Sequence, residues 1–128
     1  MGRAALPGAP LSDLPILDPK PLQDLVDLGA EAELIQELIT LFLEDAPLHM
    51  AALHQALDAS DAEQVMQEAH QLKGALGNMG LVRFADLAAQ LEIQARGGNL
   101  EQAPPLAAVL PAAFEEARQA LDAAFPKA

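Results

Sequence analysis

A histidine, a lysine and two glycines lie within eight residues of one another, in the stretch "AHQLKGALGNMG" at residues 69–80. On an α-helix, residues three, four and seven apart lie on one face, so Lys73, Gly74 and Gly77 share a face with His70. Glycine in a helix interior costs about 1 kcal/mol relative to alanine. We interpret Gly74 and Gly77 as positions cleared of side chains, so that another macromolecule can approach the imidazole, and Lys73 as a cation for an arriving anion.

Each of these residues also has an ordinary explanation. A single histidine on a helix is more often a surface or packing residue, and Lys73 alone would be a solvated charge. Gly77 and Gly80 can both end a helix. Gly74, however, lies a full turn before any expected helix end, so the spacing as a whole favours a functional site around His70.

Composition indicates one helical domain with a core. The chain has 128 residues, 52% of them hydrophobic, and no cysteine. The absence of cysteine excludes disulfides, thiolate catalysis and cysteine metal sites. The formal net charge of −12 disfavours binding to nucleic acid and to anionic membranes.

Proline, glycine and apolar periodicity divide the chain into five helical segments. A short helix is expected after Pro19 or Pro21 and should stop at Gly29. A second begins near Ala30 and continues, with a kink, through Pro47. Its apolar repeat consists of Leu34, Leu38, Leu41, Phe42, Leu48, Leu53 and Leu57.

The remaining three segments follow the "DASD" turn at 58–61. Asp61 is expected to cap a third helix, which ends at 77–80. The apolar stripes that should face the core are Val65, Ala69, Leu72, Leu76 and Met79 in the third helix and Phe84, Leu87, Ala88, Leu91 and Ala95 in the fourth. The fourth closes at 97–99, and Pro111 either kinks the fifth segment or marks its true start.

These segments predict an all-α fold, an antiparallel up-down four-helix bundle with a short extra N-terminal helix. Residues 1–17 are expected to form a flexible tail and residues 18–126 the domain. The sequence shows no targeting segment and no apolar run long enough to span a membrane, which predicts a cytoplasmic protein.

The stretch at 69–80 resembles the signature of histidine-containing phosphotransfer (HPt) domains, in which A-H-x-L-K-G is followed by small residues and a glycine. Upstream, "LITLFLEDAPLHMAALHQALDASD" resembles the family's second helix and turn. Downstream, "LVRFADLAAQLEIQARGGN" resembles its fourth helix. The similarity runs from about Leu17 to the C-terminus.

The resemblance implies a bundle that carries a phosphoryl group on His70 and exchanges it with the aspartate of receiver domains, without kinase activity of its own. The implied partners are response-regulator receiver domains and a sensor or hybrid histidine kinase. No cofactor is expected on the chain itself, and Mg²⁺ is expected on the receiver. Lys73 matches the family lysine that offsets phosphoryl charge, and Gly74 matches the small residue that admits the receiver.

Two further residues follow from the family pattern. Glu92 stands where many members carry a glutamine or glutamate that hydrogen-bonds the histidine ring, although it could equally be a surface glutamate. Arg83 could contact an acidic face of a partner, although a solvated arginine is the ordinary interpretation. His49 and His54 are spaced five apart rather than three or four, so no metal site is expected.

We expect a free-standing protein, because the chain starts with Met1 and its tails are short, although an excised domain of a hybrid kinase would look the same. We also expect it to be a monomer. The alternative function is a non-catalytic helical adaptor that binds signalling proteins. His70, Lys73 and Gly74 argue against that alternative, since an adaptor would not need them.

Overall fold

The computed structural model describes residues 13–127. Their regular elements are helices: α1 (Lys20–Asp27), α2 (Ala32–Asp58), α3 (Ala62–Asn78), α4 (Val82–Arg96), α5 (Ala103–Ala108) and α6 (Leu110–Ala124). The prediction of an all-α fold is therefore confirmed for this part of the chain. None of the helices within residues 13–127 is both long and apolar enough to cross a membrane.

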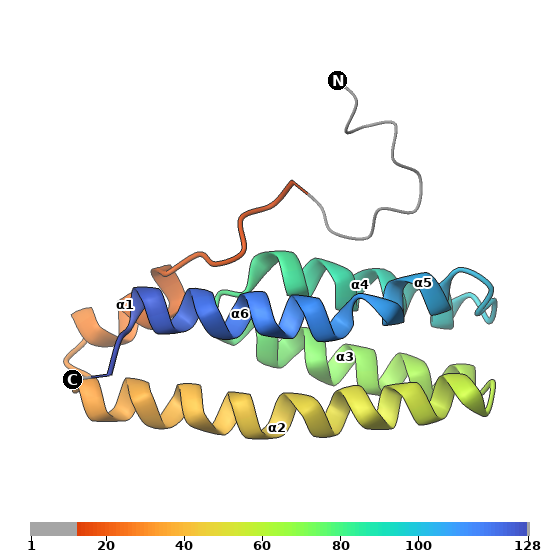
Figure 1. Cartoon of the computed structure of the whole chain (residues 1–128), viewed down its shortest axis with the longest axis horizontal. Helices are drawn as coiled ribbons and strands as arrows, with labels where there is room; N and C mark the ends of the chain where they lie inside the picture. The colour runs from red at the N-terminus through yellow and green to blue at the C-terminus, as the bar shows by residue number, and fades with distance from the viewer. Residues whose placement is uncertain (1–12, 128) are drawn as a thin grey trace.

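The long helices lie along one another and alternate in direction (Figure 1). α2 packs against α3, α3 against α4, and α4 against both α5 and α6, while α6 returns to α2. The short helix α1 packs on α2 at one end of the molecule. This arrangement brings α3 and α4 together along their length, and these two helices carry the predicted site.

Alanine and leucine side chains build most of the core. The stripe predicted for α3 is buried throughout, as is the stripe predicted for α4. Ala69, Leu72 and Leu76 are completely buried, so the residues beside them on α3 are held toward the outside. Leu76 is thus a core residue, as its place in the predicted apolar stripe indicated.

The apolar repeat predicted for α2 does not describe its buried face. Of that repeat, only Phe42 and Leu53 are buried, whereas Leu34, Leu41 and Leu48 are exposed. The face that packs on the other helices consists of Ile35, Ile39, Phe42, Ala46, Met50, Leu53 and Ala56. The expected repeat favoured the leucines, but the helix turns inward a mixed set of isoleucines, alanines, a phenylalanine, a methionine and only one leucine. As expected, the helix does not end at Pro47.

The fifth segment is two helices rather than one. α5 ends at Ala108, and α6 begins at Leu110 with Pro111 in its first turn. Proline is well tolerated there because the first-turn amide needs no intrahelical partner. Of the two expectations for Pro111, the true start of a helix is the one observed.

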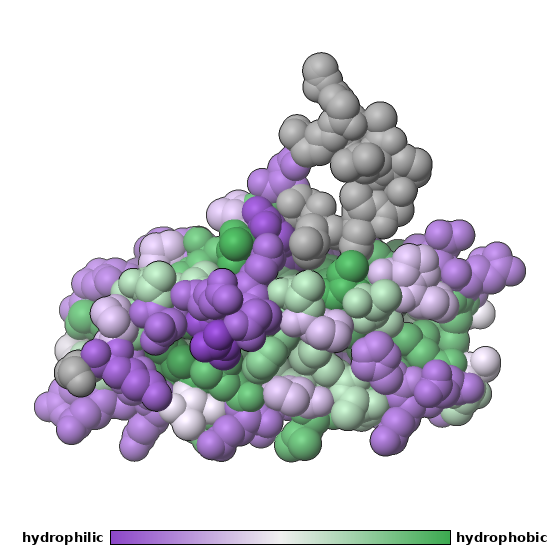
Figure 2. All heavy atoms as spheres, in the orientation of Figure 1, coloured by the Kyte–Doolittle hydropathy of each residue, from purple (hydrophilic) through white to green (hydrophobic). Residues whose placement is uncertain are grey.

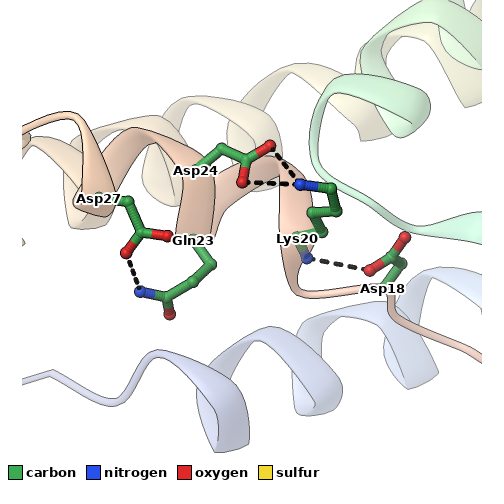
Figure 3. A network of polar contacts seen from close by, with 5 residues as sticks. All are labelled: Asp18, Lys20, Gln23, Asp24 and Asp27. Atoms are coloured by element: carbon green, nitrogen blue, oxygen red, sulfur yellow. Dashed lines mark hydrogen bonds and ion pairs between the residues drawn. The ribbon is translucent and has the colours of Figure 1, made fainter.

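Polar contacts fix the start of α1 (Figure 3). The backbone N–H of Lys20 donates to Asp18 Oδ1 at 3.0 Å, and Lys20 Nζ donates to Asp24 one turn along. Asp24 raises the pKa of Lys20, mainly by accepting this hydrogen bond. These bonds anchor the helix that was expected after Pro19.

The segment just before α1 differs in part from the predicted flexible tail. Leu17 packs against the core cluster, and the Leu14 carbonyl accepts a hydrogen bond from Arg83. The last residues of the expected tail therefore contact the helices, because packing the apolar side chain of Leu17 against the core removes it from water. Residues 1–12 of the expected tail lie outside the described residues.

Gly80 joins the turn after α3 to the chain before α1. Its φ is +77°, a left-handed conformation that favours glycine, and its carbonyl accepts a 2.7 Å hydrogen bond from the N–H of Asp18. A Cβ at this position would lie 2.1 Å from the Asp18 carbonyl oxygen. Gly80 is thus a helix terminator, as expected, and also a close-contact point between two segments.

Candidate functional site

His70 lies on the outward side of α3, and its side chain is 66% exposed. The helix begins at the Asp61 cap, whose side chain accepts from the Gln64 N–H at 3.1 Å, as predicted. Because Ala69 and Leu72 on either side are buried, the packing of α3 fixes the direction in which the imidazole projects. The ring is therefore within reach of another protein.

Glu92 of α4 holds one edge of the imidazole. His70 Nδ1 lies 2.9 Å from Glu92 Oε2, and the Glu92 side chain is only 4% exposed. A carboxylate can only accept, so Nδ1 carries the hydrogen in this contact and Nε2 is left with its lone pair when the ring is neutral. From the sequence, Glu92 could be either a partner of the imidazole ring or a surface glutamate. In the structure it is buried and contacts the ring.

Two cations share the same carboxylate. Lys73 Nζ lies 2.8 Å from Glu92 Oε1, as an ion pair without hydrogen-bond alignment, and Arg96 donates to Oε2 at 2.6 Å. The Lys73 and Arg96 side chains are 40% and 65% exposed. A buried carboxylate thus fixes two partly solvated cations beside the imidazole.

The pKa of Glu92 is lowered by these neighbours. Lys73 is the largest cause, and the hydrogen bond from His70 acts in the same direction, while burial opposes both. The carboxylate is therefore ionised at neutral pH, although it is almost fully removed from water. An ionised Glu92 is what allows it to accept from Nδ1 and hold both cations at once.

The glycines on the His70 face leave open space. A Cβ built on Gly74 or on Gly77 would meet nothing within 4 Å, and both residues are exposed. Neither glycine is required by packing inside the protein. The missing side chains therefore leave the surface open to what approaches from outside, at a cost in helix stability.

An open hollow of about 300 Å³ lies beside the ring, between α3 and α4. Its lining consists of Met66, Gln67, His70, Gln71, Glu92 and Arg96. A nucleophilic ring nitrogen, two cations and a shallow accessible surface suit the transfer of a small anionic group between macromolecules. Among residues 13–127, no three histidine, aspartate or glutamate side chains come together as a metal site would require.

Arg83 is held by contacts within the chain. Its Nε donates to the Leu14 carbonyl at 2.8 Å, and its guanidinium lies 3.6 Å from Glu116. Arg83 is nine residues before Glu92 on α4, about 14 Å along the helix axis. The structure therefore does not place Arg83 with the other predicted site residues, and its side chain, 24% exposed, is paired within the chain rather than fully solvated.

Sequence reasoning did not single out Arg96. The available signal was its position four residues after Glu92, which places both side chains on one face of α4. His49, for which the sequence analysis considered only a metal site, lies with Nδ1 2.9 Å from Glu68 Oε1 and is two-thirds buried. That contact lies between α2 and α3, separate from the contacts around Glu92.

Comparison with known proteins identifies the family of the chain. The family model described as the Hpt domain matches residues 37–120. Among solved structures, the chain is similar to histidine-containing phosphotransfer protein B (HptB) from Pseudomonas aeruginosa PAO1. The two share 33% identity, with 88% of this chain and 96% of that one covered and a TM-score of 0.78. No curated protein matches the chain.

Proposed function

The chain belongs to the Hpt-domain family and is a histidine phosphotransfer protein of phosphorelays, and we propose that His70 is the residue that carries its phosphoryl group. The observation that carries this proposal is the exposed imidazole whose Nδ1 is bound to a buried carboxylate while two cations lie beside it. His54 and His49 lie on α2, and within residues 13–127 no lysine or arginine takes part in the polar contacts of either.

In the proposed reaction, Nε2 of His70 attacks the phosphorus of an aspartyl phosphate on a receiver domain. The N–P bond forms as the bond between phosphorus and the aspartate oxygen breaks, and the aspartate leaves as a free carboxylate. The imidazole becomes positively charged as Nε2 gives its lone pair, and Glu92, bound at the Nδ1 hydrogen, offsets that charge. The reverse sequence returns the group to a receiver.

Lys73 and Arg96 are proposed to stabilise the phosphoryl oxygens. Phosphoryl transfer passes through a loose transition state with negative charge on the equatorial oxygens, so positioned cations contribute most of the stabilisation that side chains can give. Glu92 holds the charged group of each side chain, and both side chains are partly exposed. The N–H donors that Glu92 does not bind can therefore face an incoming phosphoryl group. Mg²⁺ is proposed to bind the receiver rather than this chain.

Gly74 and Gly77 are proposed to admit the receiver. We also propose that the chain has no kinase activity, that a sensor or hybrid histidine kinase supplies the relay, and that the chain acts as a monomer in the cytoplasm. An antiparallel four-helix bundle of α2, α3, α4 and the α5–α6 pair, with α1 as the extra helix, is the architecture we propose for it.

Transfer of radiolabelled phosphate tests the assignment of His70. The protein is incubated with a ³²P-labelled phosphorylated receiver domain and Mg²⁺, and the label it gains is tested for stability in acid and in base. We expect an acid-labile, base-stable label that is absent from His70→Gln and retained by the matched control His54→Gln. Label retained by His70→Gln would refute the assignment.

The alternative of a non-catalytic adaptor predicts a different outcome. An adaptor would bind the receiver with the same affinity in wild type and His70→Gln but would gain no label in either. The accessible ring and the paired cations favour the phosphocarrier, because an adaptor has no use for an ionised carboxylate buried beneath a histidine.

A further inference from the structure

A short segment before α1, residues 14–18, lies against the turn that joins α3 to α4, and we call it the strap (Figure 1). The Asp18 N–H donates to the Gly80 carbonyl at 2.7 Å, and the Leu14 carbonyl accepts from Arg83 Nε at 2.8 Å. Gly80 follows the end of α3, and Arg83 lies in the first turn of α4. The strap therefore contacts both sides of the turn between the two helices that carry the site.

A few specific contacts hold the strap in place. Both strap groups that form these hydrogen bonds belong to the backbone, and Leu17, between them, packs against the core. Arg83 is itself held, because its guanidinium lies 3.6 Å from Glu116 of α6. In the space-filling view, hydrophobic and hydrophilic residues are mixed on this side of the molecule (Figure 2). Loss of one hydrogen bond should therefore loosen the strap measurably.

The glycine end of α3, residues 74–78, is weak as a helix. Three of these five residues are glycine or asparagine, which are poor helix formers. The Met79 nitrogen lies 3.3 Å from the Ala75 carbonyl oxygen, just beyond the usual range for such a bond. The buried side chains of Leu76 and Met79 hold the inner side of this end. Its outer side has only the helix backbone, so the bond from the strap to the turn that follows is a substantial part of what keeps it from fraying.

We propose that the strap is a positioning element for phosphotransfer, which keeps the glycine end of α3 helical so that a receiver meets an ordered surface. This rests on the proposed function, in which Gly74 and Gly77 admit the receiver. Gly77 follows His70 by seven residues, about 10 Å along the helix axis, so the strap acts on the surface that the receiver approaches and not on the ring. A receiver that meets an ordered surface spends no binding energy on ordering it.

Binding and chemistry should respond differently when the strap is loosened. The apparent affinity for a receiver scales with the fraction of molecules whose glycine end is ordered. His70 and Glu92 hold each other directly at 2.9 Å, so the chemical step in the bound complex should not change. The receiver concentration that gives half-maximal transfer should therefore rise, while the limiting rate constant stays the same.

Two substitutions of Asp18 test the bond to the turn. Asp18→Pro removes the N–H that binds Gly80, whereas Asp18→Ala keeps that N–H and loses only the side-chain bond to the Lys20 N–H. Hydrogen exchange followed by NMR then reports on the amides that close the helix. We expect the Met79 and Gly80 amides to exchange about fivefold faster in Asp18→Pro than in Asp18→Ala, which is what one neutral hydrogen bond is worth. Exchange at Val65, near the start of α3, should be the same in both.

Transfer from a ³²P-labelled phosphorylated receiver, with the receiver in excess and Mg²⁺ present, measures the effect on function. The half-saturating receiver concentration should be about two- to fivefold higher in Asp18→Pro than in Asp18→Ala, at the same limiting rate constant. Arg83→Met removes the donor to Leu14 without changing the backbone and should give a smaller rise in the same direction. It carries the same test if Asp18→Pro does not fold, which circular dichroism checks.

Leu53→Ala is the control for a loss of stability alone. Leu53 is fully buried on α2, away from the strap, so its substitution lowers the stability of the whole protein. At temperatures where this variant is folded, its half-saturating receiver concentration should equal that of the wild type. A rise in this control equal to that of Asp18→Pro would reduce the strap to a general stabiliser and overturn the proposal.

Three further results would overturn it. Equal exchange at Met79 and Gly80 in both Asp18 variants would mean that the strap does not hold this end of α3. Faster exchange with an unchanged half-saturating concentration would mean that the receiver does not depend on it. A lower limiting rate constant alone would assign the strap to the chemistry at His70. In all of these cases the label still reaches His70, whereas a wild-type chain that gains no label would refute the proposed function and this inference with it.

Discussion

Alanine substitution of the three glycines in the His70 motif should change the free energy of unfolding in different directions: Gly74→Ala should stabilise the protein and Gly80→Ala should destabilise it. Gly74 lies inside α3, four residues before its end, and an added Cβ would meet nothing within 4 Å beyond the adjacent helix backbone, so Gly74→Ala introduces no clash. Replacing a helical glycine with alanine stabilises by about 0.8–1 kcal/mol. For a domain of this size, that corresponds to a rise in Tm of about 4 °C.

Gly80→Ala should destabilise the protein instead. Placing alanine in the left-handed region costs about 1–2 kcal/mol. The added Cβ would lie 2.1 Å from the Asp18 carbonyl oxygen, so this backbone must move and the 2.7 Å hydrogen bond from the Asp18 N–H is lost. Losing that bond adds about 0.5–1.5 kcal/mol, for a total of about 1.5–3.5 kcal/mol. Gly77 is close to the end of α3, so its gain on substitution should be smaller than that of Gly74.

Thermal and urea unfolding, followed by circular dichroism, measure both changes, and a phosphotransfer assay then separates stability from function. Gly74→Gln should keep or raise the Tm and slow transfer from a receiver at least tenfold, because the new side chain occupies the approach to the ring. Ala112→Gln, at an exposed position of α6, is the matched control and should leave transfer unchanged.

Two results would refute this reasoning. If Gly74→Ala lowered the Tm, a contact of the glycine inside the protein would have been missed. If Gly74→Gln transferred phosphate at the wild-type rate, the open surface would have no role in admitting the receiver.

Three further changes test the carboxylate, its cations and the core. Glu92→Gln should cost about 1–2 kcal/mol at pH 7, since the ionised carboxylate accepts charge-assisted bonds and its cations are partly solvated. Because folding lowers the pKa of Glu92, that stabilisation is present above the ordinary glutamate pKa and is lost as the pH falls through the lower pKa of the folded state. Urea unfolding should therefore show a smaller difference in stability between Glu92→Gln and wild type at pH 3 than at pH 7. An equal difference at both pH values would contradict the lowered pKa of Glu92. Arg96→Gln should change stability by less than about 0.5 kcal/mol but slow phosphotransfer several-fold, and a wild-type rate would remove Arg96 from the site. Leu53→Ala, at a fully buried position of α2, should cost about 3 kcal/mol in urea unfolding without altering transfer at temperatures where it is folded, and a cost below 1 kcal/mol would mean that the core around it collapses to fill the cavity.

Local periodicity in the sequence was sufficient to predict most of the helices and the face of α3 that carries His70. The buried stripes of α3 and α4 follow the 3.6-residue repeat, and His70, Lys73 and Gly74 share a face for the same reason. The cap at Asp61 is likewise a local feature, because its partner, the Gln64 N–H, lies within the next turn.

The buried face of α2 could not be obtained in this way. The helix has apolar residues on more than one side, so periodicity alone does not say which side faces the core. Packing against α3 and α6 selects the side with Ile35, Ile39 and Phe42, and leaves Leu34 and Leu41 in water.

The chemistry of His70 depends on the same distinction. The amino-acid sequence by itself places an imidazole, a lysine and a cleared surface on one helix, because these residues are neighbours along the chain. Only the tertiary structure brings Glu92 of α4 under the ring, joins Lys73 of α3 to the carboxylate that Arg96 reaches along α4, and ties Arg83 to Leu14 and Glu116. The reason is physical: spacing along a helix determines which side chains share a face, whereas contacts between helices depend on how their buried faces pack.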